Sequence, residues 1–210
     1  MNFYDPDGRD IYIFDANGSY IETIKECQED YIQWNRGKDD VMKISFADPN
    51  SDSRRINENT KLICLNENQI REIINGQGGF TSSISDFVKE SVGGGNFDYS
   101  VSVLSGYSNG AQEYSSKGNR ESSGSELISP ILFIPEGQNV AHNLMNFGNF
   151  LWGATGASLG VKPMILKMGA HANSLLNSTK NGYRPQFDSS DDQRSITLGI
   201  DYAKQHHYAK

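Results

Sequence analysis

Hydrophobic and polar residues alternate along two short segments near the start of the chain. Residues 10–15 read DIYIFD and residues 20–24 read YIETI, and the polar stretch between them contains Asn17 and Gly18. An Asn-Gly pair between two alternating segments is typical of a β-hairpin, because the tight turn needs residues that tolerate a positive φ. The same alternation at residues 41–47 and 97–105 predicts two further strands.

Helical periodicity replaces this alternation in the last third of the chain. Residues 139–160, residues 162–182 and the segment from Ser190 onward each repeat apolar residues at helical spacing, which predicts three main helices. Pro163 suits the first turn of the second helix. Ser190 and Gln193 have the spacing of a capping box for the third. Shorter helices are expected at residues 66–76 and 83–95, both of which end in glycine.

Four glycines interrupt the first of the main helices: Gly148, Gly153, Gly156 and Gly160. Each glycine costs a helix interior about 1 kcal/mol relative to alanine, so four of them require a reason. Close approach of another helix backbone or of a ligand would supply one. A kink or a turn within the segment is the alternative.

A stretch rich in serine, glycine and asparagine separates the strand-like part from the helical part. It covers residues 105–126 and is poor in aliphatic side chains, as linkers and long loops are. We therefore expect an α+β protein, with a β-containing N-terminal part followed by a compact helical C-terminal unit. The expected divisions are a short leading segment at 1–16, a β-containing linker module with the Gly/Ser-rich loop at 17–125, and the helical domain at 126–210.

Composition and net charge limit the classes of partner that the protein can be expected to bind. Hydrophobic residues make up 36% of the chain and the mean hydropathy is −0.57. No apolar segment approaches the roughly 20 residues of a membrane-spanning helix, so no stable membrane span is expected. The formal net charge is −7, which counts against charge-driven binding to nucleic acid and suits a partner with a basic face.

Two histidines in the helical part are candidates for chemistry, although no strong catalytic signature occurs in the sequence. His142 and His171 are each a candidate general base or metal ligand, because imidazole titrates near neutrality. His171 lies on the edge of an apolar stripe with Met164 and Met168, where a hydrogen-bonded core histidine is the alternative. His142 lies among asparagines, which is more typical of a cleft.

Three aspartates cluster around the start of the last helix. Asp188, Asp191 and Asp192 are candidates for acid–base work or for holding a divalent metal, the one cofactor that the sequence suggests. The alternative is a favourable interaction with the helix dipole. The candidate catalytic residues are therefore His142, His171, Asp188, Asp191 and Asp192. The candidate substrate-binding residues are Asn146, Asn149, Trp152 and Arg194.

The beginning of the chain resembles a known boundary motif between two parts of a longer protein, called the seam below. YDPDGRDIY, at residues 4–12, is similar to the Y-D-P-x-G-R element that ends the YD-repeat shell of rearrangement-hotspot (Rhs) proteins. In those proteins a variable toxin follows the element. The resemblance implies that residues 1–16 are the tail of such a shell and that the rest is its tip.

Residues 140 to 208 resemble the family called bacterial toxin 44. The resemblance rests on three segments in the family's order: NFGNFLWGATGASLG, KMGAHANSLLNS and NGYRPQFDSSDDQRSITLGIDYAKQH. The family's G-N-x-x-W-G element matches Gly148, Asn149, Trp152 and Gly153. Its later elements match His171, Asn173, Asp188, Asp191, Asp192 and Gln193.

This resemblance implies an antibacterial toxin that is secreted, delivered into a target bacterial cell by a secretion apparatus, and neutralised in the producer by a cognate immunity protein. The reaction stays open between three hypotheses. A nuclease is favoured, with His142 or His171 as base and Asp191 and Asp192 holding a metal or orienting the histidine. A hydrolase of peptidoglycan or its lipid-linked precursor would use paired carboxylates. A non-enzymatic pore former would use the small-residue spacing of residues 148–160.

Overall fold

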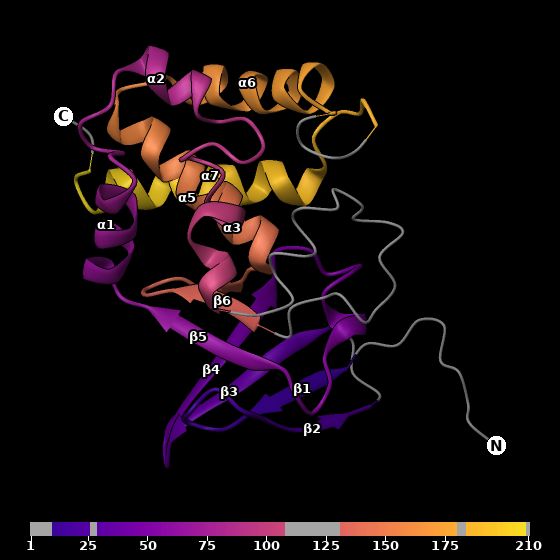
Figure 1. Cartoon of the computed structure of the whole chain (residues 1–210). Coiled ribbons are helices and arrows are strands. Elements are labelled where there is room, and N and C mark those ends of the chain that lie inside the picture. Colours follow the sequence, from indigo (N-terminus) through magenta and orange to yellow (C-terminus); the bar gives the residue numbers. More distant parts are fainter. Residues whose placement is uncertain (1–9, 26–28, 108–130, 180–183, 209–210) are drawn as a thin grey trace.

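The computed structural model describes residues 10–25, 29–107, 131–179 and 184–208. Most of the expected seam and of the Gly/Ser-rich stretch lies outside these residues. The described residues confirm the α+β class, because strands gather at one end of the molecule and helices at the other (Figure 1). The last three helices pack together as the expected C-terminal unit.

A mixed five-stranded sheet forms the strand-rich end. In spatial order its strands are β2 (Tyr20–Ile24), β1 (Ile11–Phe14), β3 (Tyr31–Gly37), β4 (Asp40–Phe46) and β7 (Val140–Ala141). β1 and β2 pair in antiparallel fashion, which confirms the hairpin, and Gly18 has a φ of 75° in the turn. β7 comes from the C-terminal half and pairs in parallel with the last two residues of β4. The helical part is therefore attached directly to the sheet.

A second pair of strands joins the two halves of the chain. β5 (Lys61–Leu65) pairs in parallel with β6 (Ile131–Pro135), and all five residues of β6 are buried. Isolated bridges between Ser19 and Lys61 and between Phe133 and His142 connect this pair to the larger sheet. The chain on either side of residue 125 therefore shares one strand pair.

The helices are, in chain order, α1 (Glu67–Gly76), α2 (Ile84–Lys89), α3 (Tyr99–Ser102), α5 (Leu144–Ser158), α6 (Pro163–Leu176) and α7 (Ser190–Gln205), with short 3₁₀ turns at Ser53–Arg55 and Leu104–Tyr107. The strand expected at residues 97–105 is wrong, because α3 and a 3₁₀ turn occupy that segment. Phe97, Tyr99 and Leu104 are buried there. A helical turn buries these apolar residues as well as a strand would, so their short alternation did not decide between the two.

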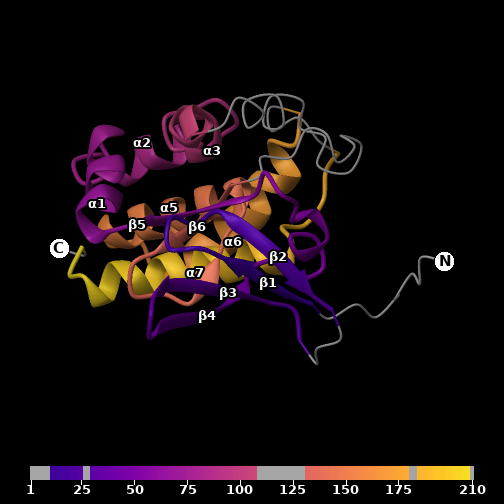
Figure 2. The same cartoon turned by 90° about the horizontal axis from the view of Figure 1, so that it is seen from below.

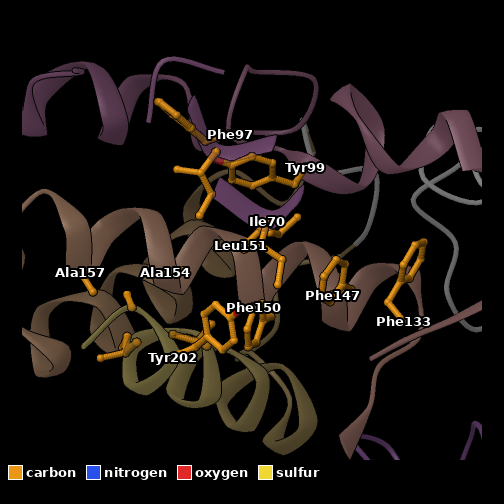
Figure 3. Close-up of a cluster of buried hydrophobic side chains, with 14 of the residues drawn as sticks. Ile70, Phe97, Tyr99, Phe133, Phe147, Phe150, Leu151, Ala154, Ala157 and Tyr202 are labelled. Atoms are coloured by element: carbon orange, nitrogen blue, oxygen red, sulfur yellow. The ribbon is translucent and has the colours of Figure 1, made fainter. Parts of the chain in front are cut away.

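One hydrophobic cluster fills the helical end and draws on both halves of the chain. Ile70 and Phe87 from the N-terminal half pack in the same cluster as residues of α5 and α7. Figure 3 shows its aromatic centre, where Phe147 stacks on Phe150 with ring centroids 5.4 Å apart. A second cluster lies between the five-stranded sheet and the β5–β6 pair and contains Phe14 and Phe46.

Helices α5 and α7 approach each other so closely that side chains are excluded at two points. A Cβ atom added at Gly199 would lie 1.9 Å from the carbonyl oxygen of Phe150, and one added at Gly153 would lie 2.4 Å from that of Ile196. Of the two explanations for glycine in α5, close backbone approach therefore applies at Gly153. Gly160, with a φ of 80°, follows the end of the helix.

Replacing Gly199 tests this contact. We expect Gly199→Ala to lower the free energy of unfolding by about 3 kcal/mol or more, because overpacking against backbone cannot be relieved by rotating a side chain. Gly76→Ala is the matched control, since nothing lies within 4 Å of its added Cβ, and we expect it to be neutral or to stabilise by less than about 1 kcal/mol. Urea unfolding followed by circular dichroism measures both. Equal stability of the two variants would contradict the close contact.

Candidate functional site

A pocket with a cavity volume of about 100 Å³ opens between the helices. Its walls come from the segment 91–101, which includes the start of α3, from one face of α5, from α6 and from Asp188, which precedes the N-cap of the last helix. Figure 2 shows α1, α2 and α3 in a row beside α5. The polar side chains in its lining belong to Ser91, Asp98, Tyr99, Ser100, Asn149, Trp152, Asn173, Ser174 and Asp188.

Three of the candidate residues from the sequence meet in this pocket: Asn149, Trp152 and Asp188. Trp152 is held in place from two sides. Its indole Nε1 donates to Ser91 Oγ at 2.7 Å, and its ring stacks on Phe87 with centroids 5.2 Å apart. The tryptophan thus presents a fixed aromatic surface in the pocket.

The carboxylate of Asp188 is fixed by both neighbouring helices. Ser174 Oγ on α6 donates to Asp188 Oδ1 at 2.9 Å, and Gln193 Nε2 on α7 donates to Asp188 Oδ2 at 2.9 Å. The backbone N–H of Asp188 donates to His171 Nδ1 at 3.1 Å. His171 therefore orients the residue that carries the carboxylate, and its ring meets Phe187 edge-on.

The capping box expected at Ser190 and Gln193 is wrong by one residue. Ser189 is the N-cap of α7, and its side chain accepts from the backbone N–H of Asp192. Two consecutive serines offer the same chemistry, so the sequence alone did not fix the register. Gln193 instead faces α6, where its amide donates to Lys167 O as well as to Asp188.

The three aspartates at this helix start point in different directions. Asp192 is buried and accepts a hydrogen bond from Asn149 Nδ2. Asp191 acts on Asp48, which follows β4: burial, and then the charge of Asp191, raise the pKa of Asp48. Within the residues that the structure describes, no three His, Cys, Asp or Glu side chains converge to hold a metal ion. Of the three aspartates, Asp188 is the one that lines the pocket among the residues that the structure describes.

His142 lies in the core, beneath the start of α5. Its Nδ1 is 3.1 Å from Ser195 Oγ, and its ring packs against Phe147 and Phe150. Burial, with a smaller effect of the Arg194 charge, lowers the pKa of His142 to about 3, so the imidazole is neutral at physiological pH. The flanking asparagines suggested a cleft, but the bridge between His142 and Phe133 turns the ring inward.

Two candidate substrate-binding residues have contacts elsewhere. Asn146 is buried in the first turn of α5, where its backbone N–H donates to the N-cap Asn143. Arg194 Nη1 donates to the carbonyl oxygen of Phe46 at 2.9 Å and thereby fastens α7 to the end of β4. Neither residue lines the pocket.

Residues 91–101 supply a wall of the pocket that the sequence pattern did not indicate. Asp98 contributes a second carboxylate to the pocket and accepts from Ser100 Oγ at 2.8 Å and from the backbone N–H of Gly94 at 2.9 Å. Polar residues at Asp98 and Ser100 among the large apolar residues Phe97 and Tyr99 were the available signal. The apparent strand pattern assigned them to a solvent face instead.

Comparison of the chain with protein-family models, with curated protein sequences and with solved structures gave no match in any of the three. The chemistry of the pocket must therefore be inferred from its own residues.

A buried carboxylate lies at the junction between the sheet and α5. Asp52 is 3% exposed and accepts from Asn143 Nδ2 at 2.9 Å. Burial is the main reason why the pKa of Asp52 rises from 3.8 to about 7, and the charges of Asp48 and Asp191 add to the shift. The folded protein thus prefers the protonated form, so this group stabilises the fold at low pH and loses that contribution as the pH rises from about 4 to 7.

Replacing Asp52 by asparagine should remove this pH dependence. We expect Asp52→Asn to match the original protein at pH 4 and to exceed its stability at pH 7.5, by up to about 4 kcal/mol since one pKa unit corresponds to about 1.4 kcal/mol. The amide still accepts from Asn143. Urea unfolding at both pH values measures the difference, with the exposed Asp39→Asn as control. A constant difference between Asp52→Asn and the original protein at the two pH values would contradict the assignment.

Proposed function

We propose that this chain is the toxin-bearing tip of a secreted Rhs-type polypeptide and that its pocket hydrolyses a glycan of the bacterial envelope. One observation carries the choice of substrate. The pocket combines two carboxylates, Asp98 and Asp188, with a fixed tryptophan, Trp152, and two side-chain amides, Asn149 and Asn173. No lysine, arginine or histidine occurs among the described residues that line it.

This set of side chains suits a sugar better than a phosphodiester. Carboxylates and amides hydrogen-bond hydroxyl groups, and an aromatic ring offers a flat apolar surface to a sugar ring. Glycoside cleavage needs two carboxyl groups, one as acid and the other as base or nucleophile. Hydrogen bonds from Ser174 and Gln193 hold the carboxylate of Asp188 in a fixed position, so we assign Asp188 the role of base or nucleophile.

The nuclease that the sequence favoured has less support. The pocket carboxylates repel a phosphate backbone unless cations intervene, and its described lining contains no basic side chain. His142 is neutral and buried, and His171 has its Nδ1 engaged by the backbone of Asp188. These contacts therefore give no support to the role of general base for either histidine.

A pore-forming activity also has no specific support. The glycines of α5 serve contacts within the protein, with α7 at Gly153, with Leu166 of α6 at Gly156 and with Ser100 of α3 at Gly148, and the helix is buried along most of its length. None of the helices in the described parts of the chain has the length and apolar character needed to cross a membrane.

Delivery and immunity enter the proposal through the sequence resemblance. The matched motif residues Asn149 and Trp152 come from one segment and Asp188 from another, and all three line one pocket. Their convergence supports a shared function for the motif. We therefore retain secretion, delivery into a target bacterium and neutralisation by an immunity protein as parts of the proposal.

Toxicity with compartment control tests the function. The full chain should kill a bacterial host when it is exported to the periplasm and should not kill from the cytoplasm. We expect Asp188→Asn to reduce the release of soluble fragments from purified peptidoglycan at least 100-fold, the usual size of a lost acid–base group. Asp201→Asn, an exposed change of the same kind on α7, is the control and should retain activity.

Thermal unfolding of both variants shows whether Asp188→Asn retains the fold. Killing from the cytoplasm alone, with degradation of RNA or DNA by the purified chain, would replace the glycan hydrolase by the nuclease. Full activity of a folded Asp188→Asn variant would remove the pocket from the proposal.

A further inference from the structure

The apolar stripe of α6 points outward and not into the core. The buried face of this helix consists of Leu166, Ala170 and Ser174. On the opposite side large apolar residues are exposed to solvent, and Phe187 extends this surface through its ring contact with His171. We call this surface the outer face of α6; its residues, with their exposed fractions, are Met164 (68%), Ile165 (58%), Met168 (62%), Leu176 (83%) and Phe187 (72%).

The charged side chains of α6, of its N-cap and of residues 184–187 are basic, in contrast to the acidic chain. The helix and its N-cap carry Lys162 and Lys167 and no aspartate or glutamate. Arg184 is exposed in the segment that leads to Phe187. The chain as a whole has a formal charge of −7, so this combination of apolar and basic residues departs from its average composition.

We propose that the outer face of α6 seats the protein on an anionic lipid surface. A helix that lies in the membrane interface inserts an apolar face beside the headgroups, while basic residues at its margin meet anionic lipid. Lysine suits that margin because its apolar stem follows the acyl boundary and its ammonium group reaches the headgroups. At 14 residues, α6 is about 21 Å long, which is enough to lie along the interface without crossing it.

The geometry of the face favours a lipid surface over a protein partner. A single helix whose exposed methionine, isoleucine and leucine side chains project outward forms a ridge, and a ridge enters a fluid interface without requiring a complementary groove. The cations Lys162, Lys167 and Arg184 complement anionic headgroups in charge. A basic protein surface, the partner that the net charge suggests, would instead be repelled here.

In the docked orientation the pocket would lie on the other side of α6 from the lipid, about one helix diameter of 10–12 Å away. Ala170, Asn173 and Ser174 of α6 line the pocket, while Met164 and Met168 of the same helix lie on the outer face. The substrate would then be envelope glycan that lies next to the membrane, an inference that rests on the proposed function. The docking itself requires no activity and is tested separately.

Vesicle cosedimentation of the full chain tests the docking. We expect binding to vesicles of phosphatidylglycerol and phosphatidylethanolamine, and at least tenfold weaker binding to vesicles of phosphatidylcholine alone. Binding to the anionic vesicles should fall when the salt concentration rises from 50 to 500 mM, because salt screens the lysines.

Two sets of variants separate the apolar and the basic contributions. Met164→Gln/Met168→Gln and Lys162→Gln/Lys167→Gln should each weaken binding to anionic vesicles at least tenfold. Ile21→Gln/Val41→Gln is the matched control, since Ile21 and Val41 are similarly exposed on the distant sheet, and it should bind as the original chain does. Circular dichroism confirms that each variant is folded.

Several outcomes would overturn the proposal. These are no binding of the original chain to anionic vesicles, unchanged binding by the methionine variant, and equal losses in the control. Light scattering adds a further one: if the chain is a dimer that the methionine variant dissociates, a second copy covers the face. If the original chain binds anionic vesicles but does not cleave peptidoglycan, the proposed function is rejected and the docking proposal stands.

Discussion

The close backbone contact between α5 and α7 is the constraint on which the rest of the helical end depends. At Gly199 and Gly153 no side chain separates the two helices, so their other side chains are brought into fixed register. Asp192 reaches Asn149 across the interface, and Ser195 reaches His142. The first contact is partly buried and the second is buried, and both need this short distance because hydrogen bonds in proteins span only about 2.7–3.2 Å between donor and acceptor. The start of α7, and with it Asp188, is thereby positioned against the pocket face of α5.

The strand β6 has a corresponding role between the two ends of the molecule. Ile131 and Phe133 point into the helical cluster, whereas Leu132 and Ile134 point into the cluster under the five-stranded sheet. Alternation along a strand sends neighbouring side chains to opposite faces, so one buried strand supports two cores. The separation of the chain into a β-containing module and a helical domain therefore describes the order of the sequence, while the packing connects the two across residue 125.

Local signals in the sequence predicted the elements that depend on local chemistry. The Asn17-Gly18 turn gave the hairpin, and Pro163 marked the first residue of α6. The pattern failed where tertiary contacts decide between equivalent choices. Either Ser189 or Ser190 could cap α7. In the structure Ser189 is the cap, and Gln193 packs against α6. The same holds for the pocket residues. Asn149, Trp152 and Asp188 were identified from their motif, whereas Asp98 was not, because it precedes a helical turn where the alternating pattern had predicted a strand.

The stripe on α6 illustrates why hydrophobic periodicity does not by itself identify the core. Met164 and Met168 repeat at helical spacing, yet the packed face uses Leu166 together with the smaller side chains of Ala170 and Ser174. Small residues allow α6 to lie close to α5 and α7 and to border the pocket, so the large apolar side chains are left on the outside. Solvent exposure of such residues carries a free-energy cost of about 25 cal/mol for each Å² of apolar surface, and that cost is recovered when another apolar phase covers them. A helix that lines a polar pocket with one face and exposes an apolar, lysine-flanked face on the other therefore connects the proposed chemistry to a surface on which it can act.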